Sequence, residues 1–435
     1  MTWEWALLLY GAIITLTLIG GVAIGTSLGL VGVIGVALAS GTGLWLSFGE
    51  IVWNTTTSFT LVSVPLFVLM GEIILRGGMS KRFYEGISHL IQGVPGGLAH
   101  TNILGCAIFA ALSGSTVATA MTMGTVAIPE MQKRGYKDEL IFGTLTGGGC
   151  LGILIPPSIP MIVYGLVANV SVLDLFMAGV VPGLLLMVVF LVYVGVVVFL
   201  NPDQAPREKS LLTFKIVVTG IKDSLPIMII ILSVLGGMYW GVVTPTEAAG
   251  FGCLISLLLS VIYRDLTWRG FYLALRNATV TSCVVMFIVI NSQFLSFAVV
   301  QSGIGRGLSN ALIQSNLSPF LFFCALVAIY IVIGMFIDGL SIMLLTVPVL
   351  FPGLAALGYD PIWLGIVIVV LIELGALTPP MGLNLFAIQS TAPEISLSTV
   401  SRASRPFAVI ILIFCFVLYA FPDIALFLPR IMRGG

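Results

Sequence analysis

Two segments of the chain place adjacent prolines beside glycines and hydroxyl side chains within apolar sequence. They read GCLGILIPPSIP at 149–160 and ELGALTPPMGLN at 373–384. A Pro-Pro pair removes two backbone donors and pushes the preceding residue out of the helical region, so a helix must unwind at each pair. The freed carbonyls are the kind of ligand that holds Na⁺ at helix breaks in membranes, and the half-helix that follows presents its positive end to an anion. A proline kink that serves only packing is the alternative.

Two further segments carry polar residues between short apolar arms. SGST at 113–116 interrupts the apolar segment 98–131, and FIDGL at 336–340 interrupts 318–352. Each arm is about 15 residues long, shorter than the roughly 20 that a spanning helix needs. Polar backbone at membrane depth must be buried in protein or line a cavity. We therefore predict two re-entrant hairpins whose tips meet a cavity; one kinked span in each place is the alternative.

Five acidic residues lie in apolar sequence at apparent membrane depth: Glu72, Asp174, Glu247, Asp338 and Glu373. Because burial of a charge is expensive, each is a candidate for function. Asp338 is the strongest, since at a predicted hairpin tip it would either bind a cation or hydrogen-bond the tip backbone. Glu72 and Glu247 are expected near span ends or in helix contacts. Glu373 would pair with a basic residue or contribute to a cation site.

Enzyme chemistry has little support in the sequence. There is no GxxxxGK[ST] motif for a nucleotide, and the two histidines, His89 and His100, form no ligand cluster. Ser113 and Ser115 have no His or Lys nearby to activate a nucleophile. The six cysteines lie in apolar runs without metal-binding spacing. We therefore expect neither an enzyme nor a transition-metal site.

The elements that must position these residues are membrane spans. The 435-residue chain is 59% hydrophobic and 8% charged, whereas a soluble domain carries roughly 25% charged residues. Its balanced charge gives no indication of a nucleic-acid partner. The predicted class is an all-α polytopic membrane protein in the lipid bilayer. Apolar runs predict spans at 5–23, 24–47, 56–76, 138–168, 172–200, 216–240, 244–263, 276–300, 361–390 and 404–428.

An internal repeat relates two halves of the chain. A shift of 223 positions (379 − 156) superposes Pro156 on Pro379 and lays one predicted hairpin on the other. We expect one repeat at 1–212, with a broken helix at 138–168, and a second at 213–435, with a broken helix at 361–390. The predicted spans give an odd number of crossings between the hairpins, which makes the second repeat inverted; one miscounted span would make the repeats parallel.

Two polar segments bear on topology. The stretch 201–210 reads NPDQAPREKS, which is typical of a linker between the halves. The basic residues around it place this linker in the cytoplasm by the positive-inside rule. The segment 81–93 is too polar to span and too apolar to lie free in water, so we expect it flat at the membrane interface.

Several motifs resemble a known family. The runs SGSTVATA, GCLGILIPPSIPMIVYG, IDGLSIMLLTVPVLFP and ELGALTPPMGLNLF resemble the large membrane subunit of TRAP (tripartite ATP-independent periplasmic) transporters. The resemblance implies a Na⁺-driven importer of organic acids in the bacterial inner membrane. Its partners would be a periplasmic solute-binding protein and a small four-helix membrane subunit, unfused here because the two halves use every span. It also implies an elevator mechanism, with scaffold and transport domains interleaved across both repeats.

The same resemblance implies binding residues. One Na⁺ site would use Ser115 with carbonyls of Gly334, Gly375, Thr378 and Met381. The repeat suggests a second site near Gly152, Ile155, Ser158 and Asp338. The organic anion would lie near Ser113, Thr116 and Asn384. Related anion symporters carry Ser-Asn-Thr at both tips, and the different tips here leave the ligands of the second site open.

Other functions stay possible at this point. Another Na⁺- or H⁺-coupled anion transporter of the same superfamily would share the repeat and the breaks. A channel would need a continuous polar pore, and the polar stretch 54–58 leaves that function open. A membrane scaffold would need no pore. The sequence does not identify the solute, since a separate binding protein would select it.

Overall fold

The protein is helical throughout the part of the chain that the structure describes. The structure is a computed structural model that describes residues 2–91, 93–206, 213–263, 265–314 and 318–432. Helices are the only regular elements in these ranges, which confirms the predicted all-α class. Seven of the described helices are long and apolar enough to cross a membrane. Residues 207–212, which include part of the predicted linker, lie outside the described ranges.

The helices follow one another closely along both halves. The first half contains α1 (Trp3–Ile19), α2 (Ile24–Ser40), α3 (Trp45–Thr56), α4 (Ser63–Arg76), α5 (Met79–Leu90), α6 (Gly97–Ser113), α7 (Thr116–Lys133), α8 (Asp138–Gly149), α9 (Ile159–Val167) and α10 (Val172–Leu200). The second contains α11 (Phe214–Ile231), α12 (Gly237–Tyr239), α13 (Pro245–Ile262), α14 (Trp268–Gln301), α15 (Ile304–Gln314), α16 (Pro319–Gly334), α17 (Gly339–Ala356), α18 (Pro361–Leu377), α19 (Leu383–Thr391), α20 (Leu397–Ala420) and α21 (Asp423–Met432). The inverted relation of the halves stays a prediction.

Three expectations about the spans are wrong. A separate helix, α3, occupies a stretch taken as the gap between two spans. Helix α14 begins eight residues before the predicted 276 (276 − 268), because Thr267 caps it by accepting a hydrogen bond from the Gly270 amide at 3.1 Å. The predicted span 404–428 is two helices, since Ser396 starts α20 early and Pro422 follows its end.

The arms on either side of the polar tips are also longer than predicted. They contain 17 residues in α6, 18 in α7, 16 in α16 and 18 in α17. The arms of each pair pack side by side instead of continuing in one direction. A side chain on Gly105 of α6 would overlap Met123 of α7, and the hydroxyls of Tyr330 on α16 and Thr346 on α17 form a hydrogen bond.

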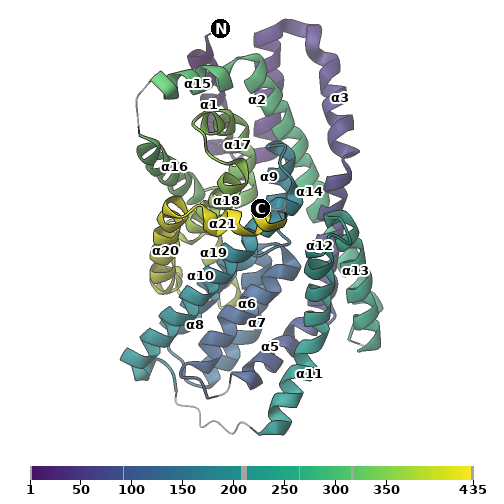
Figure 1. The fold of residues 1–435 in the computed structure, drawn as a ribbon, viewed down its shortest axis with the longest axis vertical. Helices are drawn as coiled ribbons and strands as arrows, with labels where there is room; N and C mark the ends of the chain where they lie inside the picture. The colour runs from purple at the N-terminus through teal and green to yellow at the C-terminus, as the bar shows by residue number, and fades with distance from the viewer. Residues whose placement is uncertain (1, 92, 207–212, 264, 315–317, 433–435) are drawn as a thin grey trace.

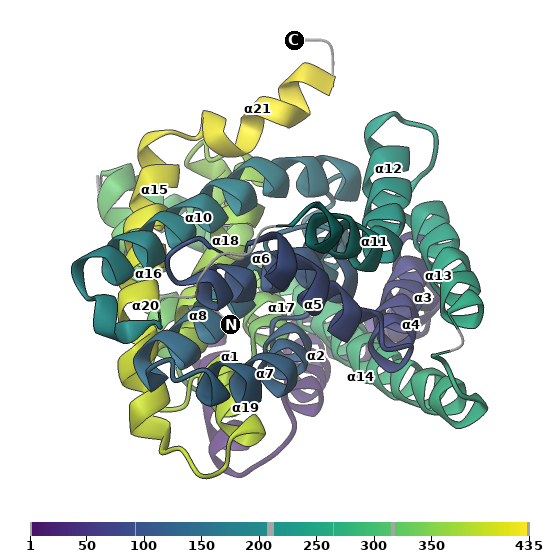
Figure 2. The same ribbon diagram turned by 90° about the horizontal axis from the view of Figure 1, so that it is seen from below.

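The helices separate into two flanks around a central group. Figure 1 shows α16 and α20 on one flank and α11 and α13 on the other, and Figure 2, seen from below, shows the same separation with α6 and α8 between them. Large apolar side chains on the α11–α14 flank point outward; Trp240 is 84% exposed and Trp268 is 82% exposed. Such a surface suits lipid or another membrane subunit.

Most of the segment predicted to lie flat at the interface, residues 81–90, belongs to helix α5. One face of α5 buries Phe83 and Ile87, while Lys81 and Glu85 lie on its other face. The helix packs on α11 so closely that a Cβ on Gly86 would lie 2.8 Å from the Gly220 carbonyl oxygen. Its position relative to a membrane stays a prediction.

Glycines allow α2 to pack directly on α14. Gly25 faces Phe287, Gly29 faces Asn291, and a Cβ on Gly32 would lie 2.6 Å from the carbonyl carbon of Phe294. The residue numbers of the contacting pairs increase in the same direction along α2 and α14, so the two helices run parallel. Close approach through small residues is the usual way in which helices associate in membranes, where lipid removes the hydrophobic driving force.

We predict that Gly32→Ala destabilises the protein by about 1–3 kcal/mol, because the added methyl meets backbone that cannot rotate away. The measurement is thermal unfolding of the purified protein in detergent. Gly250→Ala on α13 is the matched control, since a Cβ there has no neighbour within 4 Å. An unchanged unfolding temperature for Gly32→Ala would show that α2 and α14 are not in close contact.

Candidate functional site

The first polar tip lies directly on the first helix break. Ser113 ends α6, Gly114 turns the chain with a φ of 57°, and Ser115 begins α7 by accepting a hydrogen bond from the Ala118 amide at 3.4 Å. A Cβ on Gly114 would lie 3.0 Å from the Pro157 carbonyl oxygen. Glycine is therefore needed at 114 for both its conformation and its close approach.

The first break runs from the end of α8 to the start of α9. Helix α8 ends at Gly149, a 3₁₀ turn covers Cys150–Gly152, and α9 starts after Ser158, whose hydroxyl accepts from the Met161 amide at 3.5 Å. A Cβ on Gly152 would lie 2.7 Å from Cα of Thr116 and 3.1 Å from the carbonyl carbon of Ser115. Gly152 therefore lies beside Ser115, at the first tip.

The second break lies beside the second tip in a similar way. Helix α18 ends at Leu377, and α19 starts after Gly382, which has a φ of 52°. A Cβ on Gly375 would lie 2.7 Å from Cα of Gly334, at the end of α16. The hydroxyl of Thr378 donates to the Leu374 carbonyl at 2.6 Å, and Met381 is half exposed.

Contacts across the molecule tie the two breaks together. The Asn384 amide nitrogen donates to the Thr146 carbonyl at 3.3 Å and lies 3.4 Å from the sulfur of Cys150. The Cys150 thiol in turn lies 3.9 Å from the carbonyl oxygen of Glu373. Cys150 and Glu373 are equivalent positions of the 223-residue repeat (373 − 150), so the contact joins the two copies of one position. The hydroxyl of Thr116 also donates to the Glu373 carboxylate.

A cavity of about 310 Å³ opens where the tips and the breaks meet. This volume is at the lower end of the range of small-molecule sites, about 300–1,000 Å³. Residues from α4, α14 and both tips line it, and most of them are apolar. The polar side chains in the wall are those of Glu72, Ser113, Ser115, Thr116, Thr281, Asp338, Glu373 and Asn384.

The predicted site residues divide into two groups in space. Ser113, Ser115, Thr116, Asp338 and Asn384 line the cavity. The remaining predicted residues are not part of the wall and lie in the breaks and at the end of α16: Gly152, Ile155, Ser158, Gly334, Gly375, Thr378 and Met381. The contacts above place Ser115 beside Gly152, whereas the resemblance groups Ser115 with Gly334 and Gly375. Proximity therefore favours ligand sets that are divided by hairpin.

The acidic residues at membrane depth have different surroundings. Glu72 forms an ion pair of 2.9 Å with Arg76 and accepts from Asn277 of α14 at 3.3 Å, in a contact between helices. Glu247 forms a capping box with Thr244 at the start of α13. Asp338 caps α17 by accepting from the Ser341 amide at 3.1 Å, so one of its two alternative roles is present in the structure.

No basic residue in the described part of the chain pairs with Glu373, although such a pair was one of its expected roles. Its side chain is 2% exposed, its Oε1 accepts the Thr116 hydrogen bond, and its Oε2 is buried without a hydrogen-bond partner. Two other residues in or beside the wall, Cys150 and Thr281, were not predicted. The repeat offered a signal for Cys150, since it is equivalent to Glu373, while Thr281 is one hydroxyl in an apolar run and carries no local signal.

The chain matches the family model described as the DctM component of tripartite ATP-independent periplasmic transporters, over residues 11–424. The C4-dicarboxylate TRAP transporter large permease protein DctM of Pseudomonas aeruginosa is 34% identical over 405 residues, which cover 93% of this chain and 94% of that protein. The chain belongs to this family. It is a large permease of the TRAP type, a multi-pass membrane transporter and not an enzyme.

Two further similarities fit the TRAP permease. The sialic acid TRAP transporter large permease protein SiaM of Vibrio cholerae is 30% identical over 423 residues, which cover 96% of this chain and 97% of that one. Among solved structures, the Alcanivorax borkumensis YdaH transporter matches with a TM-score of 0.61 over 88% of this chain and 89% of that one, at 14% identity. That likeness concerns the fold alone.

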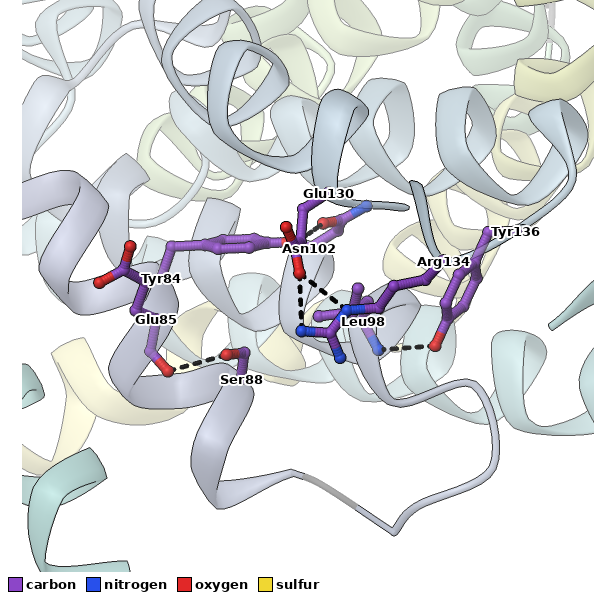
Figure 3. Close-up of polar contacts among 8 residues, drawn as sticks. All are labelled: Tyr84, Glu85, Ser88, Leu98, Asn102, Glu130, Arg134 and Tyr136. Carbon is purple, nitrogen blue, oxygen red and sulfur yellow. Dashed lines mark hydrogen bonds and ion pairs between the residues drawn. The ribbon is translucent and has the colours of Figure 1, made fainter. Parts of the chain in front are cut away.

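A buried polar cluster lies at the other end of the first hairpin from its tip. Asn102 of α6 accepts from the Tyr84 hydroxyl at 2.9 Å and donates to the Thr144 hydroxyl at 2.9 Å, so it connects α5, α6 and α8. Figure 3 shows Tyr84 reaching Asn102, with the Glu130–Arg134 ion pair and the Leu98–Tyr136 hydrogen bond next to them. Asn102 is fully buried. The cluster therefore anchors the base of this hairpin of the TRAP permease.

We predict that Asn102→Ala lowers the free energy of unfolding by about 1–3 kcal/mol, because it leaves the buried Tyr84 hydroxyl without an acceptor. Thermal unfolding in detergent measures the effect. Ser88→Ala is the control, since the Ser88 hydroxyl donates to the Glu85 carbonyl of its own helix at an exposed position. Equal unfolding temperatures for the two variants would contradict an anchoring role for Asn102.

Proposed function

We propose that this large permease belongs to a Na⁺-coupled TRAP transporter that imports an organic acid, delivered by a periplasmic binding protein, across the bacterial inner membrane. The chief support is the cavity in which both tips and both breaks meet. It offers hydroxyls from the tips and an amide from α19 in a wall with few charges. Relatives named for a C4-dicarboxylate and for sialic acid indicate the class of solute.

The Na⁺ ligands in this proposal are divided by hairpin. One set consists of Ser115, Gly152, Ile155 and Ser158, and the other consists of Gly334, Asp338, Gly375, Thr378 and Met381. Each set combines a tip with the break beside it, as the contacts at Gly152 and Gly375 support. Unwound carbonyls and hydroxyls suit a hard monovalent cation. The organic anion would lie in the cavity near Ser113, Thr116 and Asn384.

The remaining parts of the proposal concern assembly and movement. The outward-facing apolar side chains of the α11–α14 flank would meet lipid and the small four-helix subunit. The group that holds both tips and both breaks would move as a transport domain, with this flank as part of the scaffold. The observation that favours an elevator is that α6–α9 and α16–α19 join in one cluster of mutual contacts.

We predict that proteoliposomes holding this chain and its small subunit, with the binding protein outside, accumulate labelled succinate or sialic acid only under an inward Na⁺ gradient. Replacing Na⁺ with K⁺ should reduce uptake to the level of protein-free vesicles, because K⁺ is larger than the sites require. Uptake that is indifferent to this exchange would refute Na⁺ coupling. Downhill flow that does not saturate would indicate a channel.

We also predict that Asp338→Asn raises the half-saturating Na⁺ concentration for uptake about tenfold, equivalent to roughly 1.4 kcal/mol. Asparagine keeps an oxygen that caps α17 but removes the charge, so the unfolding temperature should stay close to that of the wild type. Asp360→Asn is the matched control, because Asp360 caps α18 by accepting from the Ile362 amide at 2.8 Å. Normal Na⁺ dependence in Asp338→Asn would leave Asp338 with the capping role alone.

A further inference from the structure

The charges in the cavity wall have an unexpected sign for a site that is to hold an organic anion. Three carboxylates line it, those of Glu72, Asp338 and Glu373, whereas no Lys, Arg or His is found among the lining residues that the structure describes. Like charges repel strongly in a poorly hydrated cavity. The anion therefore needs positive charge that the side chains of the wall do not supply.

Two of the three carboxylates are compensated within the protein. Glu72 pairs with Arg76 at 2.9 Å, just outside the cavity wall. Asp338 is exposed and lies at the start of α17, where the backbone amides and the helix dipole favour a negative charge. Groups of the protein itself therefore offset part of both negative charges.

Glu373 is the carboxylate without such compensation. It is 2% exposed, and the described residues form no ion pair with it; the Thr116 hydroxyl donates to its carboxylate, and the Cys150 thiol lies beside the same side chain. Its second oxygen, Oε2, is buried and has no partner. An unpaired buried carboxylate is unfavourable by several kcal/mol, which a bound cation removes.

A second residue that lines the same cavity, Asn384, also has an oxygen without a partner. Asn384 is fully buried, and its amide nitrogen must face the Thr146 carbonyl, because a carbonyl can only accept a hydrogen bond. The planar amide then directs Oδ1 away from Thr146, and Oδ1 has no hydrogen-bond partner. The Thr116 hydroxyl donates its hydrogen to Glu373, so the lone pairs of its oxygen stay available and this oxygen can be a third ligand to a cation.

We propose that Glu373, Asn384 and Thr116 form an additional Na⁺ site in the cavity wall, and that this ion is the counter-charge to which the organic anion binds. The ligands are a carboxylate, an amide oxygen and a hydroxyl, all hard donors, and a single carboxylate suits a monovalent ion. Water and the carboxylate of the solute complete the coordination. The site differs from the two sets in the tips and breaks, and its role toward the anion rests on the proposed function.

The test is binding of ²²Na⁺ to the purified chain in detergent, with no solute present. Glu373→Gln should bind fewer Na⁺ ions per chain than the wild type, by about one, because an amide cannot compensate the ion's charge. Glu247→Gln is the matched control, since it makes the same chemical change in a capping box that also accepts glutamine. Equal ²²Na⁺ binding by Glu373→Gln and wild type overturns the proposal.

A second variant and a second measurement cover the remaining outcomes. Glu373→Asp keeps the charge but shortens the side chain by one methylene, so its half-saturating Na⁺ concentration should rise about tenfold; an unchanged value also overturns the proposal. If Glu373 carries a proton in place of Na⁺, infrared spectra of the wild type show a carboxylic acid band that Glu373→Gln lacks. The wild type and Glu373→Gln then bind equal amounts of ²²Na⁺, and the proposal is overturned. Absence of succinate or sialic acid uptake would refute the proposed function, whereas the ²²Na⁺ result holds without any solute.

Discussion

A backbone group that loses its helical partner inside a membrane must find another partner in the protein, because no water is available there. The Pro-Pro pairs at 156–157 and 379–380 create this problem twice. The structure answers it by placing each break beside a hairpin tip: the first break is buried there, whereas Pro379, Pro380 and Met381 of the second are exposed. The N-terminal end of α9 is capped by Ser158, and Gly114 and Gly152 are the small residues that let the first tip lie on backbone. The cavity exists because these four interruptions are brought to one place.

The same constraint explains the rest of the packing around the site. A tip can approach a break only if its hairpin is held at a fixed depth, and for the first hairpin the buried cluster around Asn102 provides this anchor from α5 and α8. Helix α4 closes on the same tip through Gly71, where a Cβ would lie 3.2 Å from Cα of Ser113. Polar contacts at one end and glycine contacts at the other thus hold the first hairpin without a charged side chain at its tip.

Features that depend on local chemistry could be read from the sequence. The all-helical class follows from composition, and a helix break at a Pro-Pro pair follows from the missing donors. Features that depend on distant partners could not. Helix α3 has too few apolar residues to stand out, and the glycine face of α2 has meaning only beside α14. The start of α20 was predicted too late, because the span was drawn from apolar residues and the first turns of this helix are polar. That no described basic residue pairs with Glu373 is likewise a property of the packed helices.

The contact between Cys150 and Glu373 joins the two copies of one sequence position, yet the copies are chemically different. Two equivalent positions can touch only close to the axis that relates the halves. If the halves are inverted, as predicted, a carrier with two identical halves would have equal free energies in the arrangements open to the two sides of the membrane. The thiol of Cys150 and the carboxylate of Glu373 differ chemically, so these two arrangements no longer have equal free energies, and the difference arises close to the axis. The resting preference of the carrier for one side would then be set at this pair, by the ion that Glu373 holds in one arrangement and releases in the other.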